Sequence, residues 1–192
     1  MKKLVSLLLA SSVLFAACNN EGKDSVEKAD SANEAKIDSP ANNTAVVADA
    51  ETAAFLVDAA NGGMTEVQLG QVAEQKGTDA GIKRFGAMLA ADHSGANNQV
   101  KTLAAQRNVT LPATVSDEKQ KDIDDFNKKA GTAFDKSYIR YMVKDHEDDI
   151  KAFENASEDV KDSEVKAFID NTLPKLRMHL DSAKAIQKRL KY

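Results

Sequence analysis

Apolar side chains recur at steps of three and four residues from about residue 50 to the end of the chain. This spacing places them on one face of an α-helix. Turn residues divide the pattern into four long predicted helices, at residues 50–76, 78–107, 132–156 and 164–190, and one short helix from Ser116 to about Lys129. No alternating strand pattern competes with it. The chain is therefore predicted to be all-α, with an antiparallel four-helix bundle and a short extra helix between long helices 2 and 3.

The first seventeen residues have the features of a secretory signal. Two lysines precede a short apolar run, which ends in Ala16 and Ala17 directly before Cys18. This ending resembles a lipobox, although Phe15 replaces the usual aliphatic residue, and it predicts lipidation of Cys18 after cleavage. The alternatives are an ordinary signal peptide or an uncleaved anchor, but the apolar run is shorter than the ~20 residues that span a bilayer.

Residues 18–48 are rich in Asn, Ser, Ala, Asp and Lys. Such a segment buries too little apolar surface to offset the entropy lost on ordering, so we expect a disordered tether. The bundle domain is then expected over residues 49–192. Asn19 after the lipidated cysteine resembles the signal for the outer rather than the inner membrane. We expect a lipoprotein held to the outer membrane by its lipid and facing the periplasm, with exposure on the cell surface as the alternative.

The charge balance limits the class of partner. The full chain has a net charge of −4, and removing Lys2 and Lys3 leaves 24 basic and 30 acidic side chains, a net charge of −6. Nucleic-acid binding requires a clustered basic face, so we expect no nucleic-acid partner. Cys18 is the only cysteine, so the chain cannot form an internal disulfide. A protein partner is left open.

The candidate chemistry lies in the apolar stripes of the helices. His93, His146 and His179 are the only histidines, and each falls in the middle of a different long helix. Glu66 holds the equivalent position on the first helix. With ~1.5 Å of rise per residue, the four side chains fall within about a turn and a half of one level in an antiparallel bundle. They are therefore predicted to meet in one interior layer.

Buried imidazoles and carboxylates are costly unless they are paired or bind a metal. Three histidines and one glutamate suit Zn(II), Fe(II), Mn(II) or Cu(II). Met142 lies one turn before His146 and could add a thioether, which favours Cu(I), although core packing is its more common role. The alternatives are a Glu–His polar layer without metal and a chance arrangement.

Two blocks of sequence resemble a known family. The first contains Glu66-Val67-Gln68-Leu69-Gly70, Phe85-Gly86-Ala87-Met88 and Asp92-His93, and the second contains Met142-Val143-Lys144-Asp145-His146, Thr172-Leu173-Pro174 and His179. They are similar to an exported bacterial family of unknown function labelled "predicted outer membrane protein". The resemblance implies a ferritin-like four-helix bundle with no established activity. Gln68 stands where the family carries a second acid.

Ferritin-type di-iron sites use Glu-x-x-His, but Ala90, Val143 and Leu176 stand three residues before the histidines. A ferroxidase is therefore disfavoured. We expect a non-enzymatic binding or stress-related lipoprotein with a metal site in its core. The alternatives are a metal-dependent redox enzyme of ferritin-like type and a purely structural or interaction lipoprotein.

Overall fold

The computed structural model describes residues 22–38 and 48–192. These residues form six helices and no strand: α1 Ser25–Ile37, α2 Ala50–Lys76, α3 Ala80–Gln106, α4 Asp117–Lys128, α5 Gly131–Asp159 and α6 Ser163–Leu190. The all-α prediction is confirmed, and the five helices predicted from residue 50 onward are all present. The predicted signal peptide and Cys18 lie outside the described residues.

Acidic and hydroxyl side chains define where most helices begin. Asp24, Asp49, Asp79, Ser116 and Asp162 each precede a helix and accept hydrogen bonds from backbone N–H groups of its first turn. These bonds satisfy donors that have no partner inside a helix, which stabilises the helix start. Helix α5 begins without a side-chain cap.

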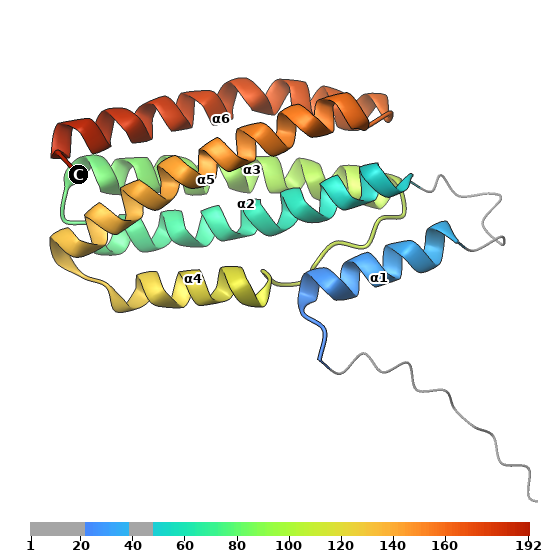
Figure 1. Ribbon diagram of the computed structural model, residues 1–192, viewed down its shortest axis with the longest axis horizontal. Coiled ribbons are helices and arrows are strands. Elements are labelled where there is room, and N and C mark those ends of the chain that lie inside the picture. Colours follow the sequence, from blue (N-terminus) through green and yellow to red (C-terminus); the bar gives the residue numbers. More distant parts are fainter. Residues whose placement is uncertain (1–21, 39–47) are drawn as a thin grey trace, which may run out of the picture.

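The four long helices lie along one another (Figure 1). Helices α2 and α3 pack closely, as do α5 and α6, and the two pairs meet through α3 with α6 and α2 with α5. Gly70 and Gly86 allow the close approach of α2 to α3, because a Cβ atom on Gly70 would lie 2.6 Å from the Gly86 carbonyl oxygen. The short helix α4 packs on the outside of α2.

Helix α1 falls inside the segment predicted to be a disordered tether. The structure instead packs it against α2, and the tether prediction is wrong for this part of the segment. Asn33 is 5% exposed; its side chain donates to the carbonyl oxygen of Thr110 at 2.9 Å and accepts from the Thr110 N–H at 2.7 Å. These contacts come from a loop 77 residues away, so the local composition did not reveal them.

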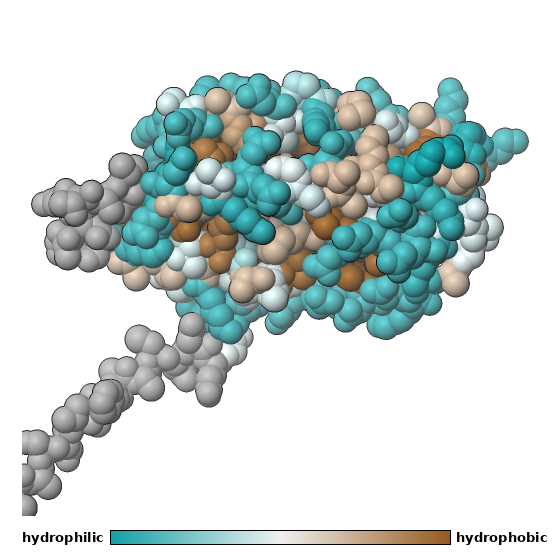
Figure 2. All heavy atoms as spheres, turned by 180° about the vertical axis from the view of Figure 1, so that it is seen from behind, coloured by the Kyte–Doolittle hydropathy of each residue, from teal (hydrophilic) through white to brown (hydrophobic). Residues whose placement is uncertain are grey.

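The apolar core consists of two clusters. One gathers around Phe85, Phe134 and Tyr138, and the other around Leu56 and Ile169. Figure 2 shows one outer face that is largely hydrophilic, with hydrophobic patches between the polar side chains. Among the described helices, none is both long and apolar enough to cross a membrane.

Candidate metal centre

A polar layer separates the two apolar clusters. Along each of the four long helices, one polar residue falls between the residues of one cluster and those of the other: Glu66 on α2, His93 on α3, His146 on α5 and His179 on α6. All four are buried, with exposed fractions between 0% and 6%. The structure therefore brings together the four residues that the apolar stripes predicted.

One nitrogen of the His146 ring is held by the backbone of its own helix. Nδ1 lies 3.0 Å from the Met142 carbonyl oxygen, one turn earlier. A carbonyl oxygen can only accept a hydrogen bond, so Nδ1 carries the proton. Nε2 is then the nitrogen with a free lone pair, and it makes no hydrogen bond within the part of the chain that the structure describes.

The His179 ring is oriented from the neighbouring helix α3. Its Nε2 lies 2.9 Å from Oδ2 of Asp92, whose other oxygen accepts from Lys175 at 2.9 Å. Although partial burial raises the pKa of Asp92, the hydrogen bonds and positive charge of Lys175 and the bond to His179 lower it on balance. The ionised carboxylate accepts from Nε2, which leaves the buried Nδ1 without a partner.

The His93 ring faces Glu66. Its Nδ1 lies 2.8 Å from Oε2 of Glu66, and its Nε2 has no partner. The second oxygen of Glu66, Oε1, lies 3.4 Å from Nε2 of His146 but makes no hydrogen bond. Glu66 therefore contacts two of the three histidines.

The three rings leave three free nitrogens in a small space. A ligand nitrogen of each ring lies within 4.8 Å of those of the other two. The ring centroids are 5.3 to 6.0 Å apart. Histidines that bind metal commonly donate their second ring nitrogen to a carboxylate or carbonyl, and each of these rings has such an acceptor. The donor set thus fits a transition-metal ion.

Burial sets the charge of the layer. Desolvation lowers the pKa of all three histidines, to about 4 for His93, so the imidazoles are neutral at pH 7. Neutral imidazole is the form that binds metals. Burial also raises the pKa of the Glu66 carboxyl, while the charge of a protonated His146 would lower it.

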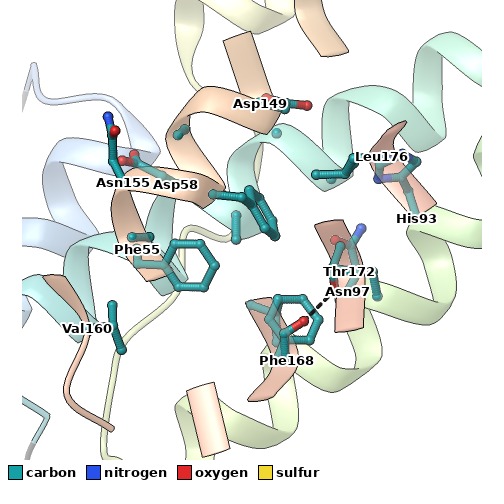
Figure 3. Close-up of a pocket in the computed structure, with 18 of the residues that line it drawn as sticks. Phe55, Asp58, His93, Asn97, Asp149, Asn155, Val160, Phe168, Thr172 and Leu176 are labelled. Carbon is teal, nitrogen blue, oxygen red and sulfur yellow. Dashed lines mark hydrogen bonds between the residues drawn. The ribbon is translucent and has the colours of Figure 1, made fainter. Parts of the chain in front are cut away.

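A cavity of about 390 Å³ extends from this layer to the surface. Glu66 and His93 line its inner end, and Figure 3 shows His93 and Leu176 at one end with Asp58, Asn155 and Val160 at the other. Asp58 and Asn155 are exposed, so that end opens to solvent.

The comparisons with known proteins give a family but no function. A family model described as "Domain of unknown function (DUF4142)" matches residues 25–186. The chain belongs to this family. No curated protein and no solved structure matches it. The DUF4142 match begins at Ser25, the first residue of α1. The match therefore includes this helix, which lies in the segment predicted to be a disordered tether.

Two acidic residues of this DUF4142 domain, Asp92 and Asp145, directly precede His93 and His146 in the sequence. Asp92 pairs with α6, through His179 and Lys175. Asp145 pairs with Lys119 of α4 at 3.2 Å. A carboxylate oxygen of Asp145 nevertheless lies within 4.8 Å of ligand atoms of Glu66 and His146.

Met142 contacts the site through its backbone. Its carbonyl oxygen accepts from His146 Nδ1, and its side chain is fully buried in the cluster around Phe85. The thioether contribution suggested by its position remains a prediction.

Proposed function

We propose that this protein is an exported lipoprotein whose helical domain binds one transition-metal ion through His93, His146 and His179. Two observations carry the proposal: each of the three rings has one buried nitrogen without a hydrogen-bond partner among the described residues, and one ligand nitrogen of each ring lies within 4.8 Å of those of the other two. Leaving three polar atoms buried and unpaired costs ~1–3 kcal/mol each. A metal ion satisfies all three at once.

Glu66 is the fourth group of the proposed site. Its Oε2 orients His93, and its Oε1 is the free oxygen beside His146. By donor type the set suits Zn(II), Fe(II), Mn(II) or Cu(II). The bound ion would supply Lewis acidity, or redox chemistry in the case of iron, manganese or copper. The protein's own groups hold the rings neutral and correctly oriented.

The proposed fold is an antiparallel four-helix bundle of ferritin-like type, formed by α2, α3, α5 and α6. Its support is the pairwise packing of these helices and the short turns that join α2 to α3 and α5 to α6. Bundles of this kind build metal sites from side chains on facing helices.

The amount of metal that the purified protein retains tests the proposed metal site. Purified full-length protein, loaded with each divalent ion in turn and then desalted, should retain one ion per chain. His146→Gln should lower retention at least tenfold, because Gln cannot replace the free imidazole nitrogen. Asp148→Asn, at an exposed acid two residues away, is the matched control and should retain the ion. Equal retention by His146→Gln and the control would refute the metal site.

The lipid anchor requires a separate test, because it rests on the sequence around Cys18 alone. Cells expressing the protein with labelled palmitate should incorporate the label and retain the protein in the outer-membrane fraction. Cys18→Ser should lose the label and release or mislocalise the protein. Label that persists in Cys18→Ser would contradict lipidation at this residue.

A further inference from the structure

The cavity beside the polar layer has the size and lining of a small-molecule site. Its volume of about 390 Å³ falls in the range of ligand pockets, ~300–1,000 Å³. Its walls are mostly apolar and include Phe55, Val100, Phe153, Phe168 and Leu176. An apolar cavity of ~150 Å³ is enough to bind benzene, so this one has room for a substituted aromatic ring.

The charges around the cavity have one sign. The acidic side chains that line it are Glu51, Asp58, Glu66, Asp149 and Asp159, and none of the described lysines or arginines lines it. Burial raises the pKa of Glu66 and Asp149, so the negative charge lies mainly at the outer end. Glu51, Asp58 and Asp159 are exposed at the outer end. An anionic ligand would be repelled along this route, whereas a cation would be attracted.

Glu66, at the inner end of the cavity, has an unsatisfied acceptor. Glu66 is 2% exposed, lines the cavity, and its Oε1 accepts no hydrogen bond. A buried carboxylate oxygen without a donor is costly. An ammonium group offers three N–H donors and a positive charge, which match this oxygen.

A glycine helps to keep the cavity open. Gly62 lies within α2, where glycine costs ~1 kcal/mol relative to alanine. It lines the cavity, and a Cβ atom at this position would meet nothing within 4 Å. Packing therefore does not require glycine here. The adjacent Gly63 differs, because its Cβ atom would collide with the Asn97 side chain at 2.1 Å.

We infer that this cavity binds a small primary amine with an apolar body, the ammonium donating to Oε1 of Glu66 and the apolar part contacting the phenylalanine walls. The inference goes beyond the metal site. Because both proposals use Oε1 of Glu66, the amine is proposed to bind the metal-free protein. The inference assigns the cavity a ligand class of its own: an arylalkyl or alkyl amine.

Three probes of similar shape test the ligand class by calorimetric titration of the full-length protein. Phenethylamine is the cationic probe, 2-phenylethanol the neutral one and 3-phenylpropanoate the anionic one. Phenethylamine should bind saturably with 1:1 stoichiometry and at least tenfold more tightly than the alcohol, and the anion should not bind. Absence of saturable phenethylamine binding, or equal affinity for the anion, would overturn the inference.

Three variants locate the binding. Gly62→Leu should fill the cavity and abolish phenethylamine binding, whereas Gly95→Leu should retain it. Gly95 is the matched control because it is also within a helix with nothing within 4 Å of its Cβ position, but it is exposed and outside the cavity. Glu66→Gln should weaken the amine about tenfold, the size expected for one charge-assisted hydrogen bond, without changing the alcohol. Unchanged amine affinity in Gly62→Leu would place the binding elsewhere.

Different variants test the metal site and the amine site, so one proposal can be refuted while the other stands. His179→Gln removes a proposed metal ligand that does not line the cavity and is bonded to Asp92 rather than to Glu66, so it should lose the metal and keep the amine. Gly62→Leu should keep the metal and lose the amine. Amine binding in a protein that retains no metal would refute the metal site alone.

Discussion

The Nε2 atom of His179, on α6, lies 2.9 Å from the Oδ2 atom of Asp92, on α3. This contact joins two helices and sets which nitrogen of the ring carries the proton. The backbone carbonyl of Met142 does the same for His146 at 3.0 Å. In both rings the bound nitrogen is the donor, so the other nitrogen is left with its lone pair inside the layer.

Asp92→Ala should weaken metal binding by about 10- to 100-fold, the usual effect of removing an acceptor behind a histidine ligand. Without Asp92, the His179 ring can rotate and exchange tautomers. Competition with a chromophoric chelator measures the affinity. Lys175→Ala is the control, because it removes the ion pair with Asp92 but keeps the contact to His179. Equal losses in both variants would assign the effect to the ion pair.

Metal removal should lower the melting temperature of the wild-type protein. An ion present at about 100 times its dissociation constant adds ~2.7 kcal/mol to the free energy of unfolding. For a domain of this size, that corresponds to a rise in Tm of roughly 5–10 °C. Differential scanning calorimetry with and without chelator measures the shift. The Tm of His146→Gln should not change when metal is added. A rise in Tm equal to that of the wild type would contradict the assignment of His146 as a metal ligand.

Glu66→Gln should change how stability depends on pH in metal-free protein. Burial raises the pKa of the folded-state carboxyl above its ordinary value of 4.5. Its contribution to stability is therefore complete below pH 4.5 and is lost as pH rises through the raised pKa. Glutamine does not titrate, so the variant should gain stability relative to the wild type between about pH 4 and 8, by ~1.4 kcal/mol per unit of pKa shift.

Urea unfolding at several pH values, in the presence of chelator, measures this difference. Glu154→Gln, at an exposed acid that pairs with Arg177 on the surface, should show no comparable trend. A difference between Glu66→Gln and wild type that stays constant with pH would mean that Glu66 titrates normally.

Gly70→Ala should destabilise the fold by about 1–3 kcal/mol, the usual cost of overpacking. Its Cβ atom would lie 2.6 Å from the Gly86 carbonyl oxygen and 3.0 Å from the Ala90 backbone nitrogen, so α2 and α3 would have to separate. Gly95→Ala meets nothing and should stabilise by about 0.5–1 kcal/mol through helix propensity. Chemical denaturation of both variants provides the comparison, and Gly70→Ala at wild-type stability would contradict the close contact.

Asn33→Ala should release α1 while the remainder of the domain stays folded. The substitution removes both hydrogen bonds to the half-buried backbone of Thr110, each with a net contribution of ~0.5–1.5 kcal/mol. Hydrogen exchange should become faster over residues 25–37 and stay unchanged in α3. Glu34→Ala, at an exposed neighbour, should preserve protection of α1. Unaltered exchange in Asn33→Ala would show that other contacts hold this helix.

Periodicity was sufficient for the helices of the main domain because each helix buries a continuous apolar face. The same reasoning placed Glu66 and the three histidines on those faces, and counting residues from the turns put them near one level. Helix α1 escaped prediction because its buried residues, Ala29 and Asn33, include no large apolar side chain. Its stability comes from contacts with α2 and a distant loop.

The sequence by itself determined the helical class, the helix boundaries to within a few residues and the residues that share an interior layer. These features depend on local periodicity and capping. Only the tertiary structure decided which nitrogen of His179 is free, that Asp145 approaches Glu66 and His146, and that a cavity opens beside Gly62. Those outcomes depend on contacts between helices, because hydrogen-bond partners and empty volume are set by how whole faces pack together.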